Sequence, residues 1–234
     1  NLAKDWNISR EACDAYAARS HQRAAAAWAE GKFADELVSV EIPQKKGEPV
    51  VFAHDEGYRA DATVETLGKL RGLEGGVVTA GNASQQNDAA AACLVVAEDK
   101  LEELGLEPIA WFHSWAAAGC DPSRMGYGPV PATERLFARN GLSFSDIGLI
   151  ELNEAFAPQV LACLKGWGWA DDDSRHEILN VNGSGISLGH PIGATGGRIL
   201  ANLTREMHRR DVKYGLETMC IGGGQGIAAV FERA

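Results

Sequence analysis

The chain has 234 residues, of which 45% are hydrophobic, and its formal net charge is −10. Because no long basic run offsets this acidic balance, nucleic acid and anionic membrane surfaces are excluded as expected partners. No run of about 18 apolar residues is present, so we expect no membrane span. The N-terminal residues Asn1 to Trp6 have the pattern of neither a signal peptide nor a transit peptide.

The five cysteines are an odd number without regular spacing. This usage favours reduced thiols and a cytoplasmic protein. No Cys-x-x-Cys pair or histidine cluster has zinc-ligand spacing. His54 is followed by Asp55 and Glu56, but consecutive side chains rarely converge on one ion. The sequence therefore predicts no metal site.

The N-terminal part of the chain predicts a long amphipathic helix. Ser9 is a favourable N-cap, apolar residues follow at helical spacing, and Gly31 ends the run. His21 lies in the middle of this run among basic and polar neighbours. We therefore expect His21 on a solvated face.

Short strands and helices are expected from residue 37 onward. Apolar runs bounded by turn residues predict strands at 37–42, 50–52, from 77, 108–115, 145–152, 178–181, 216–219 and 227–231. Capped periodic runs predict helices at 63–70, 89–104, 131–141, 154–166 and 191–210. Cys93 and Cys163 are expected inside helices as small core residues. The alternation after Pro131 predicts an α/β fold with a mixed sheet flanked by helices.

A glycine-dense turn stands out between Asn180 and Leu200. Its glycines permit backbone angles that a Cβ would forbid, and Pro191 suits a first helical position. His190 is therefore expected where a turn enters a helix N-terminus, close to free backbone amides and the positive end of the dipole. Such a place can hold an anion or a developing oxyanion. The alternative is a purely structural histidine in a turn.

A second glycine cluster runs from Cys220 to Gly226, between two predicted strands. A dinucleotide-binding fingerprint would have to open a helix, so this context excludes one. A hairpin that presents a thiol and bare backbone N–H groups to a reacting atom fits better. Cys220 and His190 could then act as an acid–base pair.

Three motifs in this chain resemble those of the thiolases, which are acetyl-CoA C-acyltransferases. They are GHPIGATG at 189–196, CIGGG at 220–224 and NEAFA at 153–157, in the order of the C-terminal motifs of that family. The resemblance implies a thiolase-like α/β fold with an inserted α+β loop domain. It divides the chain into a CoA-binding loop domain (1–84), the remainder of the N-terminal half (85–118) and the C-terminal domain (119–234).

The resemblance also implies catalytic roles for four residues. His190 would activate the nucleophile and donate to the thioester oxygen, and Asn153 would hold a water in that oxyanion hole. Cys220 would exchange the α-proton, and the N–H of Gly222 would belong to a second oxyanion hole. A nearby imidazole and backbone amides would lower the pKa of the Cys220 thiol from its usual value of about 8.5.

Four further residues are implied to contact the substrate. Ala83 and Ser84 match the segment that touches the pantetheine arm of CoA, and Met125 matches a loop methionine that lines the thioester pocket. Phe156 would supply a second apolar wall. Two departures are small: Ser184 stands where many members carry Gly, and the short segment 72–76 leaves the adenine contacts unassigned.

One departure is large: the chain has no Cys-x-Ser-Gly motif, which in thiolases supplies the acylated cysteine. We therefore expect a thiolase portion that carries the His/Cys acid–base half and is inactive alone. The reaction would be Claisen condensation or thiolytic cleavage of 3-ketoacyl-CoA. CoA and acyl-CoA would be substrates, with no separate cofactor. The expected partners are an N-terminal half, in cis or in trans, and further copies in a dimer or tetramer. The alternative is a non-catalytic acyl-CoA-binding or assembly subunit of a two-chain thiolase.

Overall fold

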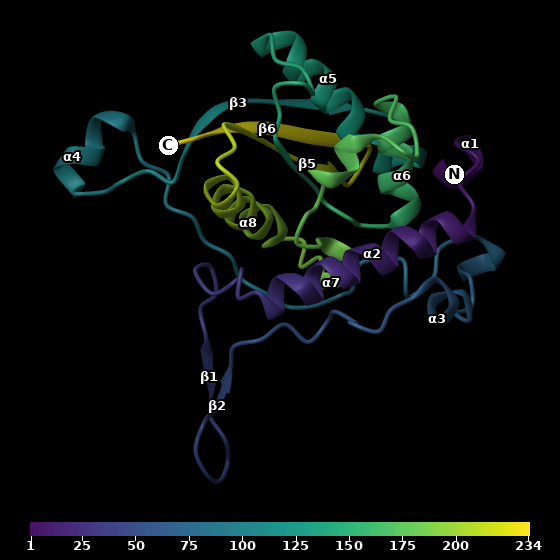
Figure 1. Cartoon of the computed structure of the whole chain (residues 1–234), viewed down its shortest axis with the longest axis horizontal. Coiled ribbons are helices and arrows are strands. Elements are labelled where there is room, and N and C mark those ends of the chain that lie inside the picture. The colour runs from purple at the N-terminus through teal and green to yellow at the C-terminus, as the bar shows by residue number, and fades with distance from the viewer.

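A four-stranded mixed sheet forms the centre of the computed structural model, which describes residues 1–234. Its strands are β3 (Ala110–Gly119), β6 (Gln225–Arg233), β5 (Tyr214–Ile221) and β4 (Leu149–Leu152), in that spatial order. β6 is antiparallel to both β3 and β5, whereas β4 is parallel to β5. The predicted α/β class with a mixed sheet is confirmed (Figure 1).

Helices cover the two faces of this sheet. α5 (Pro129–Asn140) packs on β3 and β6 on one face. α8 (Thr195–Arg209) packs on β4 and β5 on the opposite face (Figure 1). Val130 and Leu136 of α5 share the main core with Leu216 of β5. Leu203 and Met207 of α8 form a smaller core on the other side. The strands that bear the site therefore lie between two apolar layers.

The N-terminal part lies along one side of this body. Ser9 caps α2 (Arg10–Ala29) by accepting from the Ala12 N–H, as its sequence predicts. α2 packs against α6 (Ala157–Gly166), the short α7 (Gly185–Leu188) and α3 (Val64–Gly68). The helix α1 (Leu2–Asp5) precedes it, and short 3₁₀ turns lie at 73–75, 98–100, 122–127 and 174–177.

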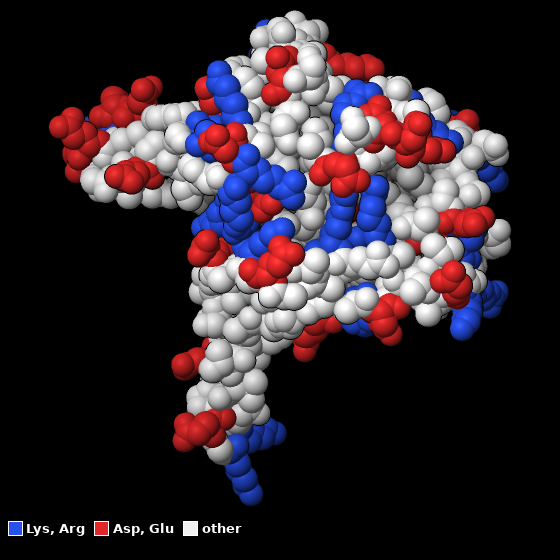
Figure 2. All heavy atoms as spheres, in the orientation of Figure 1, with Lys and Arg blue, Asp and Glu red and all other residues white.

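Two segments project from the body. One is the hairpin of β1 (Val40–Ile42) and β2 (Val50–Phe52), and the other carries α4 (Leu101–Leu104) (Figure 1). Figure 2 shows basic side chains at the hairpin tip and acidic side chains around α4. Every residue of β1 and β2 is exposed on both faces of the hairpin.

The predicted helix at 89–104 is wrong over most of its length. Only its last turn is helical, and residues 85–97 run without regular structure. Leu94 and Val95 are 75% and 84% exposed, and Cys93 is exposed instead of buried. A helix in a protein is held mainly by packing of its apolar face. Residues 86–95 are all exposed, so packing does not hold this segment in a helix and its alanine-rich composition alone does not make it helical.

Four smaller predictions also differ from the structure. The last helix begins at Thr195, not at Pro191, so His190 lies five residues before it. Residues 77–82 and 178–181 make turns and isolated bridges instead of strands. His21 is 4% exposed, not solvated. Its Nδ1 accepts from the Arg59 N–H, and burial, with the nearby Arg59 charge, lowers its pKa to about 4. His21 is buried in spite of its basic neighbours because segment 54–59 folds back over this face of α2. None of the helices combines the length and the apolar composition of a membrane span.

Candidate active site

The His190 turn connects α7 to α8. Gly189 has a φ of 92°, and an ideal Cβ there would lie 2.3 Å from Asn87 Nδ2. Only glycine therefore lets the chain pass this point. The His190 N–H is shared between the Gln85 carbonyl (3.3 Å) and Asn87 Oδ1 (3.2 Å). These contacts fix the backbone of the turn from the outside.

The imidazole of His190 is held at both ring nitrogens. Nδ1 lies 2.6 Å from Thr195 Oγ1, and Nε2 lies 3.3 Å from Asn153 Nδ2. The Thr195 hydroxyl donates its single proton to the Pro191 carbonyl at 2.9 Å. It can therefore only accept from His190, so Nδ1 carries the proton. The lone pair of Nε2 then faces the amide of Asn153.

This tautomer suits a base. The side chain of His190 is half-buried, and burial together with the nearby Arg198 charge lowers its pKa. A neutral imidazole whose Nε2 lone pair exchanges its contact with the Asn153 amide for a thiol can accept the thiol proton, and the imidazolium formed can donate to an oxyanion. Arg198 also approaches the Gly189 carbonyl at 3.4 Å, so its guanidinium supports the same turn.

Asn153 follows β4 directly, at the edge where the sequence predicted it. Its N–H donates to the Thr218 carbonyl of β5 at 3.0 Å, which extends the parallel pairing by one residue. Its side chain is fully buried, and Oδ1 has no hydrogen-bond partner. An ideal Cβ on Gly185 would lie 2.8 Å from that oxygen, so the close passage requires glycine.

Cys220 lies at the end of β5, two residues beyond Thr218, and so at the same edge as Asn153. The turn Gly222–Gly224 connects β5 to β6, with φ values of 82° at Gly223 and 87° at Gly224. Gly222 is exposed at this turn. Burial, reinforced by the nearby Cys120, raises the pKa of the Cys220 thiol. The expected lowering is wrong, because desolvation of the thiolate outweighs the backbone hydrogen bond that favours it.

The base of this hairpin touches the Met125 loop without any intervening side chain. An ideal Cβ on Gly226 would lie 2.1 Å from the Gly128 carbonyl carbon, and one on Gly128 would lie 2.3 Å from the Gln225 carbonyl oxygen. The Cys120 N–H donates to the Gly224 carbonyl at 2.8 Å. The two loops therefore form one rigid joint.

Met125 and Phe156 line one groove of about 330 Å³, between the 122–126 turn and the start of α6. Phe156 is 40% exposed, so an apolar face is available to a ligand. Ala83 pairs with Phe156, and the Ser84 N–H donates to the Ala155 carbonyl at 2.9 Å. The segment 82–84 thus lies against the same edge as the groove.

Family models match nearly the whole chain. The thiolase C-terminal domain model matches residues 106–233, and the thiolase N-terminal domain model matches residues 1–99. The chain belongs to the thiolase family. It is 50% identical to an acetyl-CoA acetyltransferase of Thiocystis violacea, over all of this chain and 58% of that protein. The chain thus spans less than two thirds of this curated relative.

Solved structures agree with this assignment. The acetyl-CoA acetyltransferase of Bacillus anthracis superposes with a TM-score of 0.94 at 42% identity, covering 100% of this chain and 58% of that one. A human mitochondrial 3-ketoacyl-CoA thiolase in complex with CoA superposes with a TM-score of 0.88 at 41% identity, covering 100% and 57%. The predicted thiolase-like fold is confirmed.

The structure brings some of the predicted residues together. His190 and Asn153 are in contact, and Phe156 pairs with Ala83. Cys220 is the penultimate residue of β5, the strand that pairs with β4 next to Asn153. The structure contains no group of three or more His, Cys, Asp or Glu side chains that could hold a metal ion.

Sequence reasoning missed the residues that hold the histidine. Thr195, Gln85 and Asn87 contact His190 directly, and Arg198 approaches the preceding carbonyl. Thr195 could have been found, because it lies five residues after His190 in the quoted motif. Gln85 and Asn87 lie about 100 residues away in sequence, as the separation of 103 between Asn87 and His190 shows. No local signal connects them to the turn.

Proposed function

We propose that this chain forms the acid–base part of a thiolase that condenses acyl-CoA molecules or cleaves 3-ketoacyl-CoA. The observation that carries the proposal is the pair of contacts of the His190 imidazole, with Nδ1 2.6 Å from Thr195 Oγ1 and Nε2 3.3 Å from Asn153 Nδ2. The names of similar proteins support both directions, since they include acetyl-CoA acetyltransferase and 3-ketoacyl-CoA thiolase.

Each residue has a defined part in the cleavage direction. His190 takes the proton of a thiol from the complementary part of the enzyme, and the thiolate attacks the 3-keto carbon. The C2–C3 bond breaks, and Cys220 protonates C2 of the departing acetyl-CoA. The Cys220 thiolate then takes the proton of the CoA thiol as its sulfur attacks the acyl-enzyme thioester, and the His190 imidazolium returns its proton to the enzyme thiolate that leaves. Asn153 and the N–H of Gly222 assist by stabilising the oxyanions. A donor of this kind contributes about 3 kcal/mol to lowering a barrier.

The raised pKa of Cys220 is compatible with this role. A thiol that stays protonated in the resting site can deliver its proton to the enolate, which is the acid step of cleavage. Condensation needs the Cys220 thiolate instead. We propose that bound substrate and the backbone amides of the 222–224 turn stabilise this thiolate.

We propose the groove of Met125 and Phe156, with Ala83 and Ser84 beside it, as the place where the thioester and the pantetheine arm of CoA bind. Its apolar walls and adjacent backbone edge support this assignment. CoA and acyl-CoA would serve as substrates, and no separate cofactor would be needed. The five free cysteines support a cytoplasmic, reducing location.

The partner that we propose is the thiolase part with the Cys-x-Ser-Gly motif, in cis or in trans. The uncovered apolar segment 89–97 and the free edge of β3, with Phe112 57% and Trp115 49% exposed, support this. We also propose a homo-oligomer, a dimer or a dimer of dimers. Dye binding to exposed apolar surface should fall when the complementary part is added.

The function is tested by assaying thiolysis of acetoacetyl-CoA with CoA. The chain alone should be inactive. Fusing it behind the part of the Thiocystis violacea relative that it does not cover should restore turnover. His190→Ala or Cys220→Ser should then lower kcat by about 10² to 10⁴. Turnover by the isolated chain through one of its own cysteines, or a fully active Cys220→Ser fusion, would contradict the proposal.

A further inference from the structure

Glu154 follows Asn153 and carries a carboxylate that the proposed reaction does not use. The residue is 1% exposed, and no Lys, Arg or His side chain forms an ion pair with it. Four donors surround it instead. Oε1 accepts from Tyr16 Oη (2.8 Å) and Asn180 Nδ2 (3.0 Å), and Oε2 accepts from Ser20 Oγ (2.6 Å) and the Ile186 N–H (3.2 Å).

These donors come from three separate parts of the chain. Tyr16 and Ser20 belong to α2, within the region matched by the N-terminal family model. Asn180 precedes the glycine turn, and Ile186 lies in α7, four residues before His190. The Glu154 carboxylate thus connects α2, in the region matched by the N-terminal family model, to Asn180 before the glycine turn and to α7 before His190.

Two of the donors cannot turn away. The Ile186 N–H is backbone, and the Asn180 amide is oriented because its Oδ1 accepts from the Leu152 N–H at 2.9 Å while its Nδ2 also reaches the Leu152 carbonyl at 2.8 Å. An amide in place of the carboxylate would have to point its own N–H₂ at one of them. The site therefore selects an acceptor-only group.

We propose that Glu154 is a positioning residue of this thiolase, which sets the distance between His190 and Asn153 by holding α2, Asn180 and α7 together. The proposal rests on the proposed function, since the contact that it maintains is the one that carries that function. A displacement of about 1 Å at such a contact can cost about 100-fold in rate.

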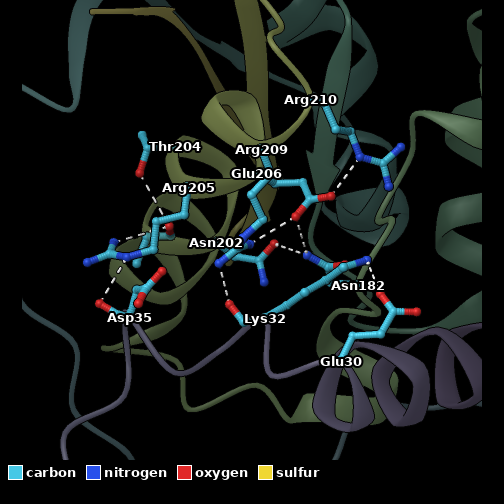
Figure 3. Close-up of polar contacts among 11 residues, drawn as sticks. Glu30, Lys32, Asp35, Asn182, Asn202, Thr204, Arg205, Glu206, Arg209 and Arg210 are labelled. Atoms are coloured by element: carbon cyan, nitrogen blue, oxygen red, sulfur yellow. Dashed lines mark hydrogen bonds and ion pairs between the residues drawn. The ribbon is translucent and has the colours of Figure 1, made fainter.

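A second buried carboxylate offers a matched control. Glu206 of α8 is 2% exposed, and it accepts from Arg209 (2.9 Å), Arg210 (2.6 Å) and Asn182 (3.2 Å) (Figure 3). It is therefore as buried as Glu154, but it accepts from three donors, two of them the guanidinium groups of Arg209 and Arg210. Figure 3 shows its contacts gathered at the C-terminal end of α8, with Arg205, Lys32 and Asp35 nearby.

The test uses the active fusion and compares Glu154→Gln with Glu206→Gln. We expect Glu154→Gln to lower kcat by about 10- to 100-fold with KM for CoA changed by no more than about threefold. Glu206→Gln should lower the melting temperature but leave kcat within about twofold. Equal kcat in the two variants at a temperature where both are folded would overturn the proposal.

Two further measurements cover failures of the first. If Glu154→Gln does not fold, Tyr16→Phe and Ser20→Ala each remove one donor, and each should lower kcat about threefold or more; unchanged kcat in both would overturn the proposal. If the unmutated fusion is inactive, the proposed function fails, and the ¹⁵N spectrum of His190 decides separately. Glu154→Gln should shift the Nε2 resonance away from that of an unprotonated nitrogen, and Glu206→Gln should not. Identical His190 spectra would reject the positioning role.

Discussion

The central sheet and the projecting hairpin use the same apolar residue types with opposite results. Leu149, Ile150 and Leu152 of β4 are at most 2% exposed, whereas Val50, Val51 and Phe52 of β2 are 42–59% exposed. β4 pairs with β5, packs against α8 and contributes Ile150 and Leu152 to the main core, but β1 and β2 pair only with each other. In Figure 1 the β1–β2 hairpin stands away from the body. An isolated two-stranded hairpin is marginally stable in water. Apolar sequence alone therefore does not decide burial; a facing surface does.

The largest expected effect compares two leucines. Leu136 is 0% exposed in the main core, and Leu94 is 75% exposed in the irregular segment 85–97. Leu136→Ala should lower the free energy of unfolding by about 3 to 4 kcal/mol, because it removes buried methyl groups and leaves a cavity. Leu94→Ala should change it by less than about 0.5 kcal/mol. Urea unfolding of both variants checks this, and equal losses would show that segment 85–97 packs in solution.

A pair of histidines extends the comparison to charge. Burial lowers the pKa of His21 to about 4, whereas His113 is exposed. The unfolded chain binds the His21 proton below about pH 6.5, so the contribution of His21 to stability should fall by about 3 kcal/mol as pH drops from 6.5 to 4. Burial raises the pKa of Glu36 to about 7 and that of Glu217 to about 8, and these two groups act in the opposite direction. His21→Gln should remove the histidine contribution from the profile, and His113→Gln should not. Unfolding free energies between pH 4 and 7 provide the test.

Segment 85–97 should become buried once the proposed complementary part is present. In the fusion, Leu94→Ala should lower the free energy of unfolding by about 1 to 2 kcal/mol, because the complementary part would bury the side chain. Val38→Ala is the matched control, because Val38 is 85% exposed just before β1 of the projecting hairpin. Insensitivity of the fusion to Leu94→Ala would place the complementary part elsewhere.

The smallest effect concerns the electrostatics of the histidine. Burial and the Arg198 charge both lower the pKa of His190, so Arg198→Met should raise it. Arg205→Met serves as the control. Arg205 lies on the same helix as Arg198, but its guanidinium donates to the Asp35 carbonyl at 3.1 Å (Figure 3). NMR titration of His190 in both variants measures the difference. A lower pKa in Arg198→Met would show that the guanidinium acts mainly through the backbone of the turn.

Local patterns sufficed for much of this thiolase. Ser9, Thr63 and the glycines after α2 and α5 mark helix ends that the structure keeps, and Asn153 follows its strand as expected. The sequence failed where the answer depended on distant surfaces. His21 is buried by residues about 38 positions away, as its bond to Arg59 shows, and segment 89–97 lacks a surface to pack on. The predicted lowering of the Cys220 pKa was wrong for the same reason, since the burial that raises it is set by tertiary packing.

The joint between Gly128 and Gly226 limits how this site can diverge. Because backbone meets backbone there, with an ideal Cβ on Gly226 only 2.1 Å from Gly128, no side chain can be enlarged or trimmed to move the Cys220 hairpin. Phe156 has no such limit, since it is 40% exposed where it lines the groove. Sequence changes that reshape the groove can therefore occur at Phe156, while Gly128 and Gly226 must stay glycine.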